Sequence, residues 1–159
     1  MNIKRKIRVF KLPSSHYKPT YFLVLAVILF LFLVFYLKSP ESKKICIKGA
    51  CIQAEVVISE RDRQKGLMYR SYLGQNNGML FIFKKLDYHG FWMKNMEFPL
   101  DIIWIGADKK IVDICQGALP CKDSTCNIIL PKYPAAFVLE LNSGFTKDHN
   151  INIGDKVLF

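Results

Sequence analysis

Charged and amide side chains set among apolar segments are the residues of this 159-residue chain that could do chemistry. Asp101 directly precedes an apolar run, and Glu140 stands between two leucines. A carboxyl group in such surroundings can act as a general acid or base, and cations or aromatic rings beside it can bind a ligand. The residues that we expect to share one concave pocket are Arg61, Arg70, Trp92, Lys94, Asn95, Asp101, Trp104 and Glu140.

Two structural explanations compete with such a site. Strand alternation can turn these side chains outward into solvent. If they point inward, an unpaired buried charge is costly, so we expect ion pairs of Arg61 with Glu140 or of Lys94 with Asp101. A pocket lined in this way suits a small polar ligand, such as a carbohydrate or an envelope fragment, because aromatic rings cover the apolar faces of sugars.

Recognised catalytic motifs are missing from the sequence. It has no Gly-x-Ser-x-Gly turn, no glycine-rich phosphate loop and no paired histidines on a helix. Ser124 and Thr125 are interpreted as polar loop residues. We therefore expect a binding or accessory domain without chemistry of its own. The alternative is an enzyme that acts on an envelope substrate with Asp101 or Glu140 as general acid or base.

Four of the five cysteines form two pairs with equal spacing. Cys46 and Cys51 flank a predicted hairpin, and Cys121 and Cys126 lie in one predicted loop. Outside the cytoplasm such pairs favour two local disulfides, although four cysteines allow three connectivities. Cys115 lies in an apolar strand pattern and is interpreted as a small buried residue.

No metal or cofactor is expected. Zinc sites need cysteine pairs with closer spacing, and the histidines of this region, His89 and His149, stand alone. Methionine thioethers could bind copper(I), but methionines within Leu, Phe and Trp runs more often fill gaps in a core. The methionines in question are Met68, Met79, Met93 and Met96.

The N-terminal region predicts a membrane anchor. Residues 21–37 are uncharged, and the leader 1–20 carries six cations and no acid. A helix of this length spans about 26 Å, and the cations favour a cytoplasmic N-terminus. A cleavable signal peptide is disfavoured because the apolar run is long and Pro40 would obstruct cleavage. We expect one transmembrane helix, a tether over 38–44 and an extracytoplasmic domain over 45–159, with the bilayer as a partner.

The net charge of +10 does not indicate a nucleic-acid surface. Six of the 23 basic residues lie in the leader and all 13 acids lie beyond it, which leaves the outer part at +4. A charge of this size without a basic run argues against nucleic-acid binding. The sequence does not identify a protein partner.

The outer part alternates short segments rich in β-branched and aromatic residues with turn-forming residues, as is typical of mainly β domains. Ser59, with Asp62 three residues on, predicts the start of a short helix. We expect a mainly β fold, a compact β-sandwich or half-open barrel with one or two short helices. The predicted strands are 45–47, 51–58, 79–83, 90–93, 100–105, 111–118, 135–141 and 156–159.

Several sequence blocks also carry a family resemblance. They read ERDRQKGLMYRSYL from Glu60, GMLFIF from Gly78, FWMKNMEFPLDIIWI from Phe91, AAFVLELNSGF from Ala135 and INIGDKV from Ile151. In this order and spacing, over residues 45 to 159, they resemble the domain of unknown function 192. The resemblance implies a compact mainly β fold, often behind a signal or anchor, with no established activity. Met96 departs from it, because a threonine or similar small polar residue is implied there.

Overall fold

The computed structural model describes residues 19–36, 41–121 and 126–159, and the chain divides into two compact units, Met1–Ser39 and Pro40–Phe159. Most of the predicted leader, Leu37, the first part of the predicted tether and the loop residues Ser124 and Thr125 lie outside the described residues.

The first unit contains helix α1, Pro19–Tyr36. It begins at a proline, which suits the first position of a helix because that position needs no N–H donor. The described part of the chain contains no helix with both the length and the apolar character that crossing a membrane requires. The membrane anchor therefore stays a prediction from the sequence.

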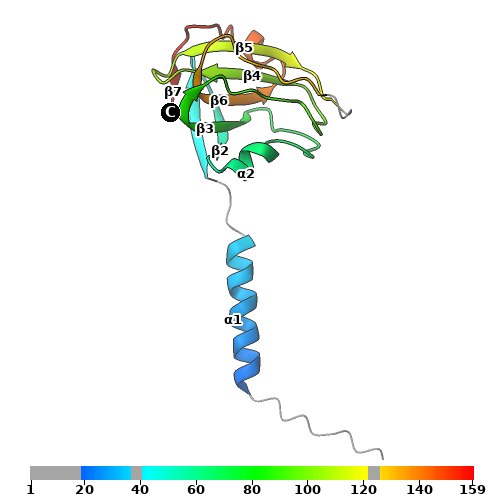
Figure 1. The fold of residues 1–159 in the computed structure, drawn as a ribbon. Helices are drawn as coiled ribbons and strands as arrows, with labels where there is room; N and C mark the ends of the chain where they lie inside the picture. Colours follow the sequence, from blue (N-terminus) through cyan, green and yellow to red (C-terminus); the bar gives the residue numbers. More distant parts are fainter. Residues whose placement is uncertain (1–18, 37–40, 122–125) are drawn as a thin grey trace, which may run out of the picture. The chain divides into compact units, whose positions relative to one another are not determined.

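The second unit is built on one seven-stranded sheet that curves into a half-open barrel (Figure 1). The strand order is β5-β4-β6-β3-β2-β1-β7. The two edges approach each other at one end, where Lys110 bridges to Lys156 and Val157 N–H donates to the Lys109 carbonyl at 2.8 Å. The strands are β1 (Ser42–Ile47), β2 (Ala50–Val57), β3 (Asn77–Asp87), β4 (Leu100–Ile105), β5 (Ile111–Ala118), β6 (Ala135–Asn142) and β7 (Val157–Leu158).

Short helix α2, Glu60–Lys65, lies in the connection between β2 and β3, which pair in parallel. Parallel neighbours cannot be joined by a tight turn, so the chain needs such a crossover. The predicted start of the helix is confirmed: Ser59 caps it, and its hydroxyl accepts a hydrogen bond from Asp62 N–H at 3.1 Å.

The sheet buries apolar side chains on both faces. One cluster includes Ile103, Leu139 and Leu141, and the other includes Ile102, Trp104 and Val138. Successive residues of a strand point to opposite faces, and β4 and β6 supply both clusters in this way. The central strands are therefore enclosed on both sides, and any polar group in them is removed from water.

Asp101 is such a group, and it joins three parts of the fold. It is fully buried and accepts hydrogen bonds from the backbone N–H groups of Gly117 at 2.9 Å, Gly144 at 3.2 Å and Thr146 at 2.9 Å. The Thr146 hydroxyl adds a fourth bond at 2.7 Å. Asp101 thus holds the end of β5 and the short helix α3, Phe145–Asp148, against β4.

The fold differs from the sequence prediction in four places. Residues 90–93 do not form a strand of the sheet, because Phe91 makes an isolated bridge to Ile129 in a loop. β1 begins at Ser42, within the predicted tether, because Ser42 to Lys44 continue the ladder with β2. Helix α3 is the second of the one or two short helices expected, at a position that the sequence did not predict. The strands form one curved sheet, so of the two predicted architectures the half-open barrel is found and the β-sandwich is not.

Both predicted disulfides are present, Cys46–Cys51 and Cys121–Cys126. Cys46 and Cys51 occupy paired positions of the β1–β2 hairpin, which brings their side chains together without a change in register. Cys115 is a free thiol and is partly buried, and burial raises its pKa above the ordinary value.

Replacing Asp101 by asparagine should destabilise the domain by about 3 to 5 kcal/mol. The amide offers one acceptor oxygen where the carboxylate offers two, and its NH2 group would face N–H and O–H donors. Urea unfolding of D101N against wild type measures the loss. Glu97→Gln, a change at an exposed carboxylate, is the control and should be neutral. Equal stabilities for D101N and wild type would contradict the structural role of Asp101.

Candidate functional site

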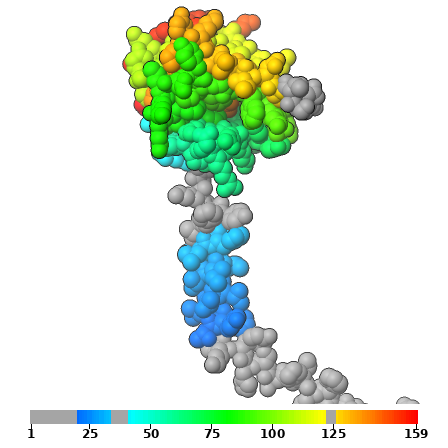
Figure 2. Space-filling model, viewed as in Figure 1, coloured from blue at the N-terminus to red at the C-terminus, as the bar shows by residue number. Residues whose placement is uncertain are grey.

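A pocket of about 580 Å³ lies on the face of the sheet that carries Trp104 and Val138. Its walls come from α2, from β3 and the loop that follows it, and from the loop around Ile128. Figure 2 shows one face of the domain, on which the teal residues of α2 lie next to the green residues of β3. The volume lies in the usual range for small-molecule sites.

Glu140 lines this pocket, and one of its carboxyl oxygens has no hydrogen-bond partner among the described residues. The residue is only 5% exposed, and its Oε2 atom is buried without a hydrogen bond to any of the described residues. Burial raises the pKa of Glu140 to about 8, although the positive charge of Arg70 acts in the opposite direction. The carboxyl group is therefore mainly protonated near neutral pH, and it can donate a hydrogen bond.

Strand pairing fixes the direction of the Glu140 side chain. Glu140 is paired with Met79 of β3 and with Ile102 of β4, and both neighbours belong to the apolar cluster under the pocket. Asp101 is next to Ile102 in the chain, so its side chain points to the opposite face. The two candidate carboxyl groups consequently lie on different sides of the sheet and cannot act on one substrate.

Aromatic rings form most of the wall beside Glu140. The Phe81 and Phe91 rings meet edge to face with centroids 4.9 Å apart, and the His89 ring stacks on Phe83 at 3.5 Å. Trp92, 42% exposed, stands at the rim. Gly90 also lines the pocket, and a Cβ atom there would lie 2.5 Å from the Ile128 side chain. A side chain at position 90 would thus displace the loop that closes this wall.

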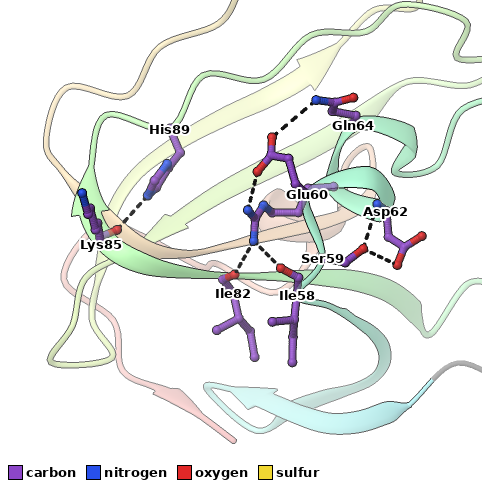
Figure 3. A network of polar contacts seen from close by, with 9 residues as sticks. Ile58, Ser59, Glu60, Asp62, Gln64, Ile82, Lys85 and His89 are labelled. Carbon is purple, nitrogen blue, oxygen red and sulfur yellow. Dashed lines mark hydrogen bonds and ion pairs between the residues drawn. The ribbon is translucent and has the colours of Figure 1, made fainter.

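The opposite wall is α2, held in place by Arg63. The Arg63 guanidinium donates to the carbonyl of Ile58 and, at 3.2 Å, to that of Ile82, and it pairs with Glu60 at 2.5 Å. Figure 3 shows these contacts together with the hydrogen bond between His89 and the Lys85 carbonyl at 3.0 Å. Arg63 therefore fixes one wall of the pocket, a role that sequence reasoning had not assigned to it.

Arg70 lies at a second, smaller hollow of about 360 Å³. Its guanidinium binds both carboxylate oxygens of Glu55, at 2.5 and 2.7 Å. This two-point hydrogen bond raises the pKa of Arg70 and lowers that of Glu55. Arg70 is consequently held by Glu55 and lines this second hollow, outside the lining of the main pocket.

The other predicted site residues lie outside the lining of the main pocket. Arg61 is exposed on α2, and the Lys94 ammonium lies 5.5 Å from the centre of the Trp92 ring. The Asn95 amide donates to the Tyr69 hydroxyl at 2.7 Å. Trp104 is buried and donates from Nε1 to the His89 carbonyl at 2.8 Å, which holds the aromatic wall in place.

The ion pairs suggested by the sequence are not formed. Among the described residues, Arg61 makes no pair with Glu140 and Lys94 makes none with Asp101. Of the predicted site residues, the main pocket is lined by Trp92 and Glu140. The aromatic lining from β3 was missed because a run such as GMLFIF looks the same whether it covers a core or a cavity.

Two of the methionines, Met68 and Met96, also line the pocket, whereas Met79 and Met93 are buried in the apolar cluster. Met96 is 4% exposed. Within the described ranges, no group of three His, Cys, Asp or Glu side chains is placed to hold a metal ion. The methionines therefore add polarisable apolar surface to the pocket.

Comparisons with known proteins support the fold and the family. Residues 43–159 match the family domain of unknown function 192, described as "Uncharacterized ACR". A comparison with curated proteins found no match. The chain is similar to the crystal structure of a protein of unknown function from Novosphingobium aromaticivorans, with 30% identity and a TM-score of 0.71 over 77% of this chain and 89% of that one.

It is also similar to the crystal structure of a putative transcription regulator from Sinorhizobium meliloti, with 32% identity and a TM-score of 0.69. That match covers 76% of this chain and 95% of the other. Both solved chains thus consist almost wholly of the matched domain, so this fold forms in them with little additional chain. The family match covers most of the sequence, and the chain therefore belongs to the domain of unknown function 192 family.

Proposed function

We propose that the domain binds a small molecule in the pocket above Glu140. The observation that carries the proposal is the Oε2 atom of Glu140, which is buried in the pocket lining and lacks a hydrogen-bond partner among the described residues. A buried polar group without a partner is unfavourable, typically by about 1–3 kcal/mol. A ligand atom that accepts a hydrogen bond from the Glu140 carboxyl group would remove this cost.

The rest of the lining defines what the ligand must carry. The faces of the aromatic rings favour a ligand with a planar or apolar body. Glu140 favours a ligand with one hydrogen-bond acceptor at the end that lies deepest in the pocket. A carbohydrate-like or other envelope molecule meets these conditions if it presents an apolar face to Trp92 and Phe91. The proposed activity is binding, with no chemical step.

One observation favours an enzyme as the second candidate. A general acid works best when its pKa is near the operating pH, and burial raises the pKa of Glu140 to about 8. Glu140 is the proton donor in this alternative. Asp101 is not part of it, because its oxygens are taken by four hydrogen bonds on the opposite face of the sheet.

We also propose that the N-terminal segment anchors the protein in a membrane and leaves the domain on the extracytoplasmic side. The support is the uncharged run over 21–37 and the six cations of the leader. The two disulfides agree with an oxidising compartment.

The protonation state of Glu140 predicts a pH dependence of stability. The unfolded chain releases this proton near pH 4.5 and the folded domain keeps it up to about pH 8, so the unfolded state binds fewer protons in between. The free energy of unfolding of wild type, relative to Glu140→Gln, should fall by about 3 kcal/mol between pH 4.5 and 7 and level off above pH 8.

Urea unfolding of residues 40–159, which form a compact unit, measures this difference. E97Q is the control, because an exposed carboxylate should leave the pH profile of the wild type unchanged. If the profiles of wild type and E140Q run parallel, Glu140 is ionised in the folded domain at no cost and the neutral donor is excluded.

The binding proposal predicts saturable binding of 2-naphthyl acetate, which joins an apolar ring system to an ester carbonyl. Amide and indole NMR signals of residues 40–159 should shift at Trp92 and its neighbours. Glu140→Leu, which has no donor, should weaken binding about fivefold to tenfold. E140Q keeps a donor at every pH, whereas binding to wild type should weaken above pH 8 as the carboxyl group ionises.

Release of 2-naphthol, followed by fluorescence, separates the two candidate functions. Under the binding proposal the ester is recovered intact. Hydrolysis that wild type accelerates and E140Q does not would establish the enzyme instead. If no pocket signal shifts with either this probe or methyl β-glucoside, the small-molecule proposal fails.

The anchor proposal predicts that the full chain sediments with membranes and resists extraction at alkaline pH. Protease added to intact spheroplasts should remove the domain. The double variant Val27→Arg, Leu31→Arg should release the chain from the membrane, because each central arginine costs about 2.5–3.5 kcal/mol on insertion. The matched control is V27L with L31I, which should remain in the membrane. A wild-type chain recovered in the soluble fraction would overturn the anchor.

A further inference from the structure

The rim of the pocket carries free positive charge. Lys65 lies at the end of α2, and Lys84 and Lys85 lie toward the end of β3. All three side chains are exposed, and within the described part of the chain their ammonium groups have no hydrogen-bond or ion-pair partner. They come from two different elements, and the neighbours Lys84 and Lys85 both line the pocket where β3 has a register irregularity, between Ile82 and Asp87.

The acids of the pocket offset only part of this charge. Glu60 is neutralised by Arg63 at 2.5 Å, and a carboxyl group as deeply buried as Glu140 is preferentially uncharged. Asp87 is the remaining acid of the lining, and one of its oxygens accepts a hydrogen bond from Tyr88 N–H at 2.8 Å. Positive charge therefore dominates at the rim.

Below this charged rim the pocket is apolar. Leu67 and Phe81 are each 1% exposed, and both line the interior. Ile128, 63% exposed, continues the apolar lining outward to the rim. A bound molecule would thus meet an apolar interior at one end and several ammonium groups at the other.

The geometry points to an amphipathic organic anion as the ligand of this pocket, with its apolar body between the aromatic rings and its negative group against Lys65, Lys84 and Lys85. This assignment rests on the proposed small-molecule function. It adds the sign of the ligand's charge and the orientation of the ligand in the pocket. A neutral sugar would leave the three lysines unused, and an organic cation would be repelled by them.

Three probes that share one ring system test the charge preference: 2-naphthoate, 2-naphthylmethanol and 2-naphthylmethylammonium. Titrations of residues 40–159 at low ionic strength and about pH 6, where naphthoate is ionised, give each Kd from NMR shifts at the pocket. Naphthoate should bind about tenfold tighter than the alcohol, and the ammonium probe weakest, because three partly screened charges each add a small factor. Added salt should reduce this preference.

The triple variant Lys65→Gln, Lys84→Gln, Lys85→Gln should remove the preference for naphthoate and leave the Kd of the alcohol within about twofold. The matched control is Lys44→Gln, Lys132→Gln, Lys147→Gln, which removes three exposed lysines outside the pocket and should keep the preference.

The outcomes separate this inference from the proposed function. If the alcohol binds in the pocket and naphthoate binds no tighter, the anion assignment fails while small-molecule binding stands. Tightest binding of the ammonium probe, or an equal loss of preference in the control variant, also overturns the assignment. If none of the three probes shifts a pocket signal while 2-naphthyl acetate still does, the anion assignment fails and the proposed function stands; if 2-naphthyl acetate also shifts none, the proposed function itself fails.

Discussion

The central strands β4 and β6 are buried on both faces, and the rest of the domain depends on this constraint. Each polar side chain within them must find a partner or lose its charge. Asp101 meets the condition with four donors from β5, α3 and the turn before α3. Glu140, one strand away on the other face, is not offered a comparable set of donors by the described residues. One strand pair therefore contains both a stabilising carboxylate and a carboxyl group with an unpaired oxygen.

The pocket lies on one face of the sheet because different elements cover the two faces. The inner face of the barrel is filled by aliphatic side chains such as Ile103 and Leu139. The outer face is covered by α2 and by loops, which line the pocket together with residues of β3 and with Glu140 of β6. The space left above Glu140 and Phe81 is lined by rings whose positions are fixed through Trp104 and Arg63. The protein's own hydrogen bonds thus define the walls of the pocket without a ligand.

The sequence predicted the elements better than the site. Runs such as Leu100–Ile105 have an unambiguous apolar pattern, and both disulfides follow from cysteine spacing at a hairpin and in a loop. Side chains alternate between the two faces of a strand. Which residues occupy the pocket face depends on the register of strand pairing, and local sequence does not encode that register. Asp101 and Glu140 were therefore assigned to one site although they lie on opposite faces. Arg63 and the aromatic lining could not be separated from ordinary surface and core positions, because a cavity is a property of the packed elements together.

The pairing of β1 with β7 has a consequence for synthesis of the chain. Cys46 is opposite Leu158 and Ile47 is opposite Val157, so more than a hundred residues separate the partners in sequence. The barrel cannot complete this edge until residues 157 and 158 have been synthesised. The hairpin of β1 and β2 forms from residues only a few positions apart and does not depend on them. The order of synthesis therefore makes β7 the strand that closes this edge. A chain that stalls before β7 would leave the edge of β1 open to pairing with other unpaired strands.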